Sequence, residues 1–184
     1  MILLSINIRG LGGVGKKRDI REKVAKHKVE ILFIQETKLE TIDNRLCKMI
    51  WDSENFEWVA QSAKGTSGGM LIIWNSSMFK YLNTFQGDGF LGVFGLSGSE
   101  NIPCYLVNIY SSQDLACKRR LWDNLSDMVN SKKGNWCIAD DFNVIQKLQE
   151  RKGGISVRRE IRDFNEFVER CGLVDLPMIG RKFT

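Results

Sequence analysis

The sequence has few of the residues that build disulfide, zinc or histidine-based sites. Its five cysteines are odd in number and widely spaced, without a C-x-x-C pair, and His27 is its single histidine. This pattern argues against a disulfide framework and against a zinc site. We therefore interpret the cysteines as small buried apolar residues. We place His27 on a helix surface and give it no catalytic role.

Long apolar runs are also missing. The longest, Met70 to Trp74, falls far short of the roughly 20 residues that cross a bilayer. The first residues include no basic stretch, and their apolar run is too brief for a signal peptide. We therefore expect an intracellular protein, nuclear or cytoplasmic, that is neither secreted nor associated with a membrane.

What the sequence does contain is enough apolar material for one packed domain. It has 184 residues, 43% of them hydrophobic and 10% aromatic, which is typical of a chain that buries one substantial core. We expect a single domain over residues 1–184, incomplete at its C-terminus because another strand begins near Thr184. The net charge is +5, and the Lys and Arg residues cluster at 16–18, 118–120, 132–133, 151–152, 158–159 and 181–182. These clusters favour a phosphate-rich partner.

Hydrophobic periodicity predicts alternating strands and helices around a strand-rich middle. Strands are expected at residues 2–8, 30–35, 57–60, 70–74, 78–85, 91–96, 103–110 and 136–139. Helices are expected at 19–28, at 41–51 with Leu46, Met49 and Ile50 as the buried stripe, at 114–131 and at 156–171. We interpret residues 56–110 as an antiparallel meander, 30–35 as a central strand covered on both faces, and 136–139 as a buried strand.

Short local patterns predict caps and turns. Asp114 and Ser156 stand at helix N-cap positions, and Gly172 stands at a C-cap position. Ser67-Gly68-Gly69 predicts a tight turn or a close approach of backbone. The glycine-rich stretch 10–15 lacks the G-K-S/T of a phosphate-binding loop, so we interpret it as a flexible turn.

Polar side chains follow three of the predicted strands. Asn7 ends the first, Glu36 follows the second, and Asp141 with Asn143 follows the strand at 136–139. In α/β folds, sites gather outside the carboxyl ends of strands, and carboxylate and amide oxygens suit Mg²⁺. Such a site favours phosphoester hydrolysis, in which a carboxylate orients or deprotonates the attacking water. The alternative, that each is an ordinary strand-end or cap residue, stays open.

Taken in order, several motifs resemble those of the endonuclease/exonuclease/phosphatase family, which includes deoxyribonuclease I and the apurinic/apyrimidinic endonucleases. They are Ser5-Ile6-Asn7-Ile8-Arg9-Gly10-Leu11, Gln35-Glu36-Thr37-Lys38, Ser67-Gly68-Gly69, Asn108-Ile109-Tyr110 and Asp141-Phe142-Asn143-Val144-Ile145. Residues 172–177 and 180–184 make the chain most similar to the endonuclease domain of plant non-LTR (LINE-type) retrotransposons. The resemblance covers essentially the whole chain.

The resemblance implies a four-layered α/β sandwich, in which two mixed β-sheets pack face to face between helices and the last strands are missing. It implies that Glu36 holds Mg²⁺, or Mn²⁺ in its place, with support from Asn7. It places Tyr110 beside the scissile phosphate, Asp141 at the nucleophilic water and Asn143 on the phosphate. Arg9 and Lys38 are expected to contact the substrate. The implied substrate is DNA, nicked by a monomer that needs no small-molecule cofactor.

The chain also departs from the family pattern. Asp140 stands where the family has glycine, and Ser111-Ser112 stand where a glycine or alanine and a proline are usual. The family's final Asp-bearing strand and its Ser-Asp-His segment have no counterpart here. We therefore expect this chain to be a weak or inactive endonuclease. The alternatives are a degenerate nucleic-acid-binding remnant of that domain, or a phosphatase or phosphodiesterase of the same fold.

Overall fold

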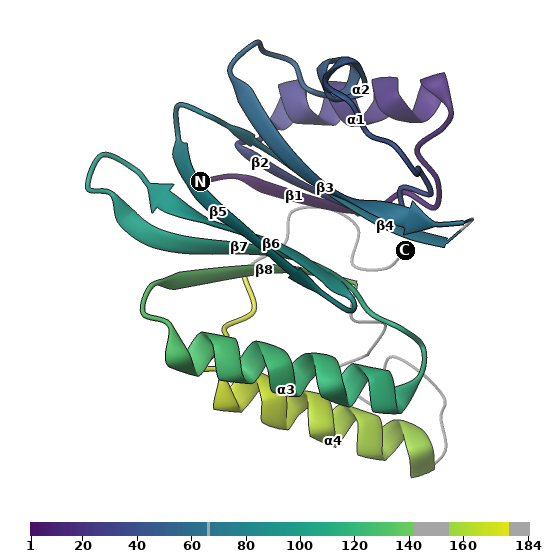
Figure 1. Cartoon of the computed structure of the whole chain (residues 1–184), viewed down its shortest axis with the longest axis vertical. Coiled ribbons are helices and arrows are strands. Elements are labelled where there is room, and N and C mark those ends of the chain that lie inside the picture. The colour runs from purple at the N-terminus through teal and green to yellow at the C-terminus, as the bar shows by residue number, and fades with distance from the viewer. Residues whose placement is uncertain (66, 142–154, 177–184) are drawn as a thin grey trace.

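The computed structural model describes residues 1–65, 67–141 and 155–176. In it, two four-stranded sheets pack face to face between two pairs of helices (Figure 1). The first sheet has the strand order β1-β2-β4-β3 and the second has the order β5-β6-β7-β8. Their bounds are β1 (Leu3–Asn7), β2 (Ile31–Gln35), β3 (Phe56–Lys64), β4 (Ser67–Asn75), β5 (Phe79–Gly87), β6 (Phe90–Ser97), β7 (Ile102–Tyr110) and β8 (Asn135–Asp141). The predicted four-layered sandwich is confirmed.

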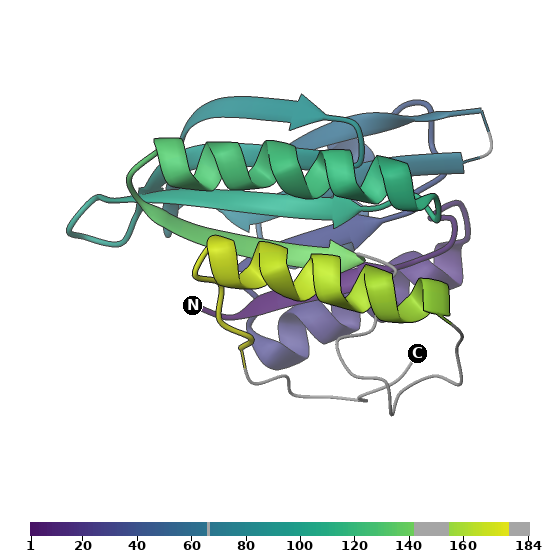
Figure 2. The same cartoon turned by 90° about the horizontal axis from the view of Figure 1, so that it is seen from below.

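Helices cover the outer face of each sheet. α1 (Val14–His27) and α2 (Asn44–Ile50) lie on the first sheet, and α3 (Leu115–Ser131) and α4 (Ile155–Arg170) lie on the second. Figure 2 shows α3 and α4 side by side along the second sheet. The buried apolar residues form three clusters, one under each helical layer and one between the sheets. The middle cluster, which includes Phe33, Ile72, Val93 and Leu106, joins the two halves of the molecule.

Both sheets combine parallel and antiparallel pairs. β1 runs parallel to β2, and β7 runs parallel to β8, whereas the other neighbouring strands are antiparallel. All five residues of β2 are buried, because the strand lies between β1 and β4 and has packed layers on both faces. The prediction of a covered central strand at 30–35 is therefore confirmed.

The predicted helix ends at Asp114 and Gly172 are confirmed. The Asp114 carboxylate accepts a hydrogen bond of 2.8 Å from the amide of Cys117, which satisfies a donor that the first turn of α3 leaves free. Gly172 follows α4 with φ +60°, and its amide donates to the carbonyl oxygen of Glu169. A left-handed residue after the last turn ends a helix in this way.

The predicted meander is wrong in its connectivity. β3 and β4 form a hairpin in the first sheet, and β4 pairs with β2 rather than with β5. The chain crosses to the second sheet between β4 and β5, and the meander proper contains β5, β6 and β7. Alternating apolar residues mark strands but do not say which strands pair.

Four local predictions also need correction. α1 begins at Val14 and so includes part of the stretch interpreted as a flexible turn. In α2, Cys47 and Ile50 are buried, whereas Met49 is exposed. Residues 136–139 are half-buried, because β8 has one neighbour, β7, among the described strands. Of the five cysteines, Cys47 and Cys104 are buried and the others are partly exposed.

Among the described residues, no helix is long and apolar enough to cross a membrane.

Candidate active site at the polar end of the sandwich

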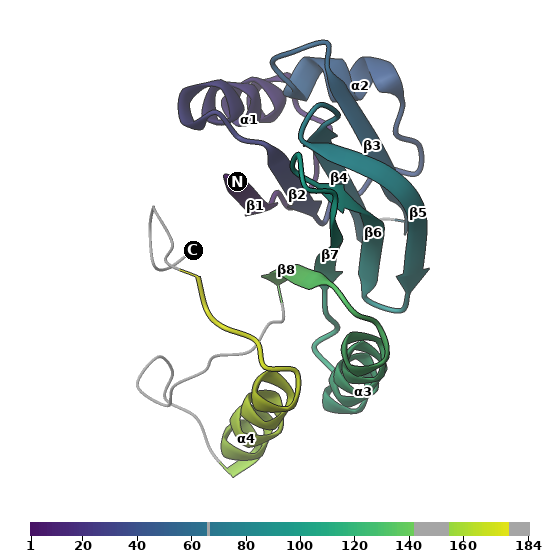
Figure 3. The same ribbon diagram turned by 90° about the vertical axis from the view of Figure 1, so that its left-hand side faces the viewer.

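Four strands end at the same edge of the sandwich. Asn7 at the end of β1 lies opposite Gln35 at the end of β2, and Tyr110 at the end of β7 lies opposite Asp141 at the end of β8. The Gln35 side chain donates to that of Asn108 near the end of β7, so these ends meet across the two sheets. Figure 3 shows β1 and β8 on the same side of the molecule, where they contact each other. The fold thus brings together segments that are up to 134 residues apart, from Asn7 to Asp141.

The layer between the sheets changes from apolar to polar along these strands. On β2, the buried residues Ile31 and Phe33 are followed by Gln35. On β7, Leu106 is followed by Asn108, which is completely buried. Because side chains alternate along a strand, these residues line the same inter-sheet layer. The site therefore lies where this layer becomes polar.

The turn after β2 holds Glu36 in a left-handed conformation. Glu36 has φ +57° and Lys38 has φ +55°, values that cost energy for residues other than glycine. The carbonyl oxygen of Glu36 accepts from the amide of Gly10 at 2.7 Å, and the amide of Lys38 donates to Gly68 at 3.0 Å. These bonds fix the turn to its neighbours in the first sheet. Strained backbone that is held in place by surrounding hydrogen bonds is common at functional sites.

The Glu36 side chain is mostly shielded and carries a cationic neighbour. Its exposed fraction is 16%, and its carboxylate lies 3.3 Å from the Nζ atom of Lys38. The Lys38 stem also passes beside Gly10, 3.7 Å from where a Cβ atom there would lie. Lys38 therefore lies between the turn after β1 and the carboxylate of the turn after β2.

The turn after β1 is held from below by α1. The ammonium group of Lys16 donates to the carbonyl oxygens of Ile8, Arg9 and Gly10 at 2.8, 3.2 and 2.9 Å. The amide of Arg9 donates to Oδ1 of Asn7 at 3.2 Å, and Arg9 has φ +47°. The Arg9 side chain is exposed beside the site.

The predicted close approach at Ser67-Gly68-Gly69 is confirmed. A Cβ atom on Gly69 would lie 2.3 Å from Oγ1 of Thr37, and Gly69 has φ +83°. The amide of Thr37 donates to the carbonyl oxygen of Gly69 at 3.0 Å. Thr37 is fully buried, and its hydroxyl has no hydrogen-bond partner among the described residues. A glycine is therefore needed at position 69 for the turn that carries Glu36 to pack against β4.

Two thiols of the inter-sheet cluster, Cys104 and Cys137, remain protonated at neutral pH. Burial raises the pKa of Cys104 to about 11. Burial, with a smaller effect of Cys104, raises the pKa of Cys137 to about 11. Neither supplies a thiolate at neutral pH, which agrees with the interpretation of both as apolar residues.

Two of the predicted site residues, Asp141 and Asn143, lie wholly or partly outside the described residues. The backbone of Asp141 ends β8, but its side chain is outside the described part of the structure, as is the whole of Asn143. The described residues contain no group of three His, Cys, Asp or Glu side chains that could hold a metal ion. They do offer Glu36 and the amide oxygen of Asn7 at one edge, and Mg²⁺ can bind through one or two carboxylates with waters in its other positions. This oxygen donor set fits such an ion.

Three residues at this edge have roles that their place in the sequence does not indicate. Gln35 and Asn108 form buried hydrogen bonds across the sheets, and Lys16 binds the turn after β1. A signal for Gln35 and Asn108 was present, since each places an amide at an alternate position after apolar strand residues. The pairing of the two could not be seen from the pattern, because they are 73 residues apart.

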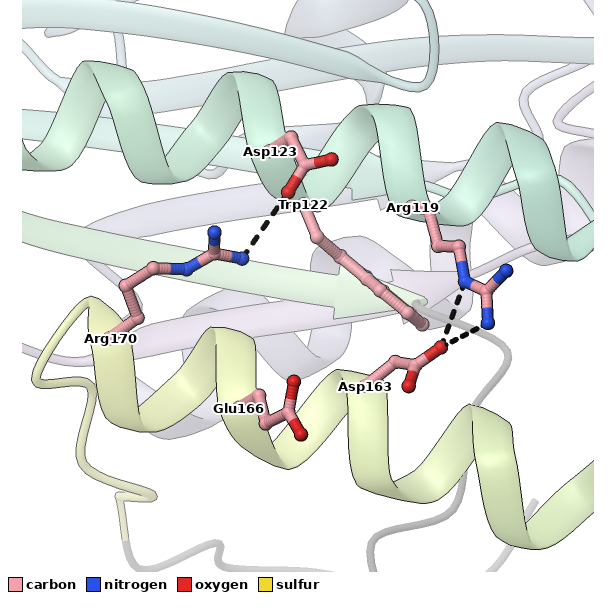
Figure 4. A pocket seen from close by; sticks show the side chains of 6 residues that line it. All are labelled: Arg119, Trp122, Asp123, Asp163, Glu166 and Arg170. Carbon is pink, nitrogen blue, oxygen red and sulfur yellow. Dashed lines mark hydrogen bonds and ion pairs between the residues drawn. The ribbon is translucent and has the colours of Figure 1, made fainter.

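A groove of about 370 Å³ lies between α3 and α4, outside the second sheet (Figure 4). Arg119 binds Asp163 at one end of it, and Arg170 lies 3.3 Å from Asp123 at the other. Burial is the largest single effect on the pKa of Asp163 and raises it, but the hydrogen bonds and positive charges of Arg119 and Arg162 together outweigh burial and lower this pKa. These groups pair with each other across the groove and hold α4 on α3.

Comparison with known proteins gives two findings. The family model described as Endonuclease/Exonuclease/phosphatase family matches residues 4–159. Among solved structures, the AP endonuclease LMAP from Leishmania major is similar with a TM-score of 0.65 and 17% identity, over 92% of this chain and 65% of that protein. An AP endonuclease from Archaeoglobus fulgidus has a TM-score of 0.62 and 15% identity, over 90% and 70% of the two chains.

The endonuclease domain of TRAS1, a telomere-specific non-LTR retrotransposon, is also similar. It has a TM-score of 0.63 and 12% identity, over 90% of this chain and 71% of that domain. This chain spans slightly less than two thirds of the Leishmania protein. At these identities, the structural likeness establishes the fold.

Proposed function

Because this chain belongs to the endonuclease/exonuclease/phosphatase family, we propose that it hydrolyses phosphodiester bonds in DNA with a divalent metal ion. Family and fold indicate nuclease or phosphodiesterase chemistry, and enzymes of this family generally use divalent metal ions. DNA as the substrate and Mg²⁺ as the ion, with Mn²⁺ as a substitute, are part of the proposal.

The observation that carries the proposal is the meeting of the four strand ends. Asn7, Glu36, Tyr110 and the backbone of Asp141 lie at one edge, where the layer between the sheets is polar. Glu36 is held there by a strained turn with bonds to β1 and β4. A rigid, partly shielded carboxylate is suited to hold a cation, because little order must be imposed when the ion binds.

In the proposed reaction, Glu36 would hold the metal ion with support from Asn7, and the ion would polarise the phosphoryl oxygens. Asp141 orients the attacking water and accepts its proton as the new P–O bond forms. The P–O bond to one sugar oxygen breaks, and the leaving oxygen takes a proton from solvent. Asn143 donates a hydrogen bond to the phosphate, and Tyr110 lies beside it. These four roles follow the family motif at matching positions.

Arg9 and Lys38 are proposed to bind the DNA backbone on either side of the scissile bond. Arg9 is exposed after β1, and Lys38 lies beside Glu36 with 39% of its side chain exposed. Contacts to phosphates give affinity without reading sequence, so binding should weaken as salt is added.

The proposal extends to the origin of the chain. We infer that it derives from the endonuclease domain of a non-LTR retrotransposon polyprotein. The motifs at residues 172–177 and 180–184 support this inference, and so does the similarity to the TRAS1 domain.

A plasmid-nicking assay tests the function. Supercoiled DNA is incubated with the protein and Mg²⁺, and the appearance of open circles is measured with and without EDTA. Glu36→Ala is expected to lower the nicking rate by about 100-fold or more. Removing one member of a catalytic unit often lowers the reaction rate by several orders of magnitude.

Glu40→Ala is the matched control, because Glu40 is an exposed carboxylate only four residues further on. It should leave the nicking rate unchanged. Nicking that survives Glu36→Ala would refute the metal-site assignment. DNA binding without nicking by the unsubstituted chain would instead favour a non-catalytic remnant.

A further inference from the structure

Two buried amide side chains join the sheets just below the candidate site. Gln35 is 1% exposed and Asn108 is 0% exposed. Nε2 of Gln35 donates to Oδ1 of Asn108 at 2.6 Å and to Oγ of Ser5 at 3.0 Å. Nδ2 of Asn108 donates to the carbonyl oxygens of Ile34 and Leu71 at 3.0 and 3.1 Å. Both amide groups therefore use their two N–H donors, and the network runs from β7 to β1, β2 and β4.

This network is better suited to fixing a position than to adding stability. A buried hydrogen bond contributes about 1 kcal/mol net, because the same groups bind water in the unfolded chain. The surrounding inter-sheet layer, with Phe33, Ile72 and Leu106, is apolar. Apolar contacts have no preferred direction, whereas bonds of 2.6–3.1 Å between amides and carbonyls do. Buried polar groups can therefore set the register of packed elements.

The network acts on the two strand ends that carry predicted site residues. Gln35 directly precedes Glu36, and Asn108 stands two residues before Tyr110 on β7. The turn at Glu36 is bonded to β1 and β4 within its own sheet. The link from Gln35 to Asn108 adds a bond to the other sheet.

We propose that Gln35 and Asn108 are positioning residues that fix the distance between Glu36 on one sheet and Tyr110 on the other. The proposal rests on the proposed function for the chemistry of the site. It adds that catalysis depends on these two amides, although neither is expected to touch substrate or metal.

Apolar substitutions of similar length and branching separate positioning from stability. Asn108→Leu alone leaves the Gln35 amide buried and short of a partner, which is destabilising. The double variant Gln35→Met/Asn108→Leu removes both amides and replaces them with apolar side chains of similar length and branching. Replacing both partners of a buried hydrogen bond with apolar groups of similar shape is often close to neutral. The double variant should therefore regain much of the urea midpoint that Asn108→Leu loses, although the carbonyl oxygens of Ile34 and Leu71 no longer receive a side-chain hydrogen bond.

If the two amides position the site, the double variant will be stable yet altered at the site. We expect its kcat for plasmid nicking to fall by about 10- to 100-fold with KM unchanged, as a misplacement near 1 Å can produce. We also expect exchange on the μs–ms timescale to appear at the amides of Glu36 and Tyr110, measured by NMR relaxation dispersion. Leu106→Met, an apolar swap at a fully buried position of the same layer, is the control and should change neither measurement.

A folded double variant with normal kcat and flat relaxation profiles would overturn the proposal. If the unsubstituted protein does not nick DNA, the proposed function fails, and the relaxation profiles alone decide the positioning role. If the double variant does not fold, Gln35→Met decides, because Asn108 keeps its two bonds to backbone in that variant. Unchanged dynamics at Glu36 and Tyr110 in Gln35→Met would then refute the proposal.

Discussion

The contact between Gly69 and Thr37 gives a prediction that compares two neighbouring glycines. Gly68 and Gly69 both have positive φ, +75° and +83°. A Cβ atom on Gly68 would have no atom within 4 Å, whereas one on Gly69 would lie 2.3 Å from Oγ1 of Thr37 and 3.3 Å from Ala63. Gly68→Ala therefore introduces backbone strain alone. Gly69→Ala introduces the same strain and also a steric overlap with Thr37.

The two costs can be estimated separately. A left-handed conformation costs an alanine about 1–2 kcal/mol, which applies to both variants. Overpacking a buried site costs about 1–3 kcal/mol more, which applies to Gly69→Ala. Gly69→Ala should thus be less stable than Gly68→Ala by about 1–3 kcal/mol. Urea unfolding followed by the fluorescence of the five tryptophans measures the difference.

A second substitution tests the cause. Thr37→Ala removes the hydroxyl that would overlap with a Cβ atom at position 69. The double variant Thr37→Ala/Gly69→Ala should therefore recover part of the stability that Gly69→Ala loses. Contacting residues typically show a coupling of about 0.5–3 kcal/mol. Equal urea midpoints for Gly68→Ala and Gly69→Ala, with no coupling to Thr37, would show that the close approach does not govern this turn.

Two further predictions concern titratable groups. A hydrogen bond from the amide of Cys117 holds the pKa of Asp114 below its usual value of 3.8. The stabilisation from this cap is therefore fully present above pH 3.8, and it is lost as the pH falls through the lower pKa of the folded state. Urea midpoints measured from pH 7 to pH 2 should show this loss, whereas Asp114→Asn, a neutral cap, should lack that part of the pH dependence. Burial, together with a smaller effect of the Asp43 carboxylate, raises the pKa of Cys47 to about 12, and burial raises the pKa of Cys104 to about 11. Both thiols should resist a thiol reagent at pH 8 until urea unfolds the chain, and fast modification of either in the folded protein would contradict their burial.

Local chemistry made several elements predictable. Asp114 and Gly172 mark helix ends because a side-chain acceptor and a left-handed residue satisfy groups within one turn of the chain. The covered strand β2 could be recognised from its continuous apolar run. The candidate site was predicted as a set of polar strand ends. The structure places the backbones of Asn7, Glu36, Tyr110 and Asp141 at one edge, and their roles stay predictions.

Errors appeared where a residue's environment comes from elsewhere in the chain. Residues 56–110 have the sequence pattern of a meander, yet β4 pairs with β2, which comes much earlier in the chain. Met49 fits a helical apolar stripe but is exposed, because the neighbouring layer meets Cys47 and Ile50 instead. Lys118 lies on the inner side of α3 at 2% exposure, where Glu160 of α4 pairs with it. A partner 42 residues away cannot be read from local periodicity.

The sequence by itself determined which segments are strands and helices, where several of them end, and which polar residues follow the strands, since these properties depend on neighbouring residues. Only the tertiary structure decided how the eight strands of the described residues divide between two sheets and that Gln35 meets Asn108 near the candidate site. Those outcomes depend on packing and hydrogen bonding between segments that the sequence separates by dozens of residues. A periodic pattern specifies a buried face, but it does not specify which other face covers it.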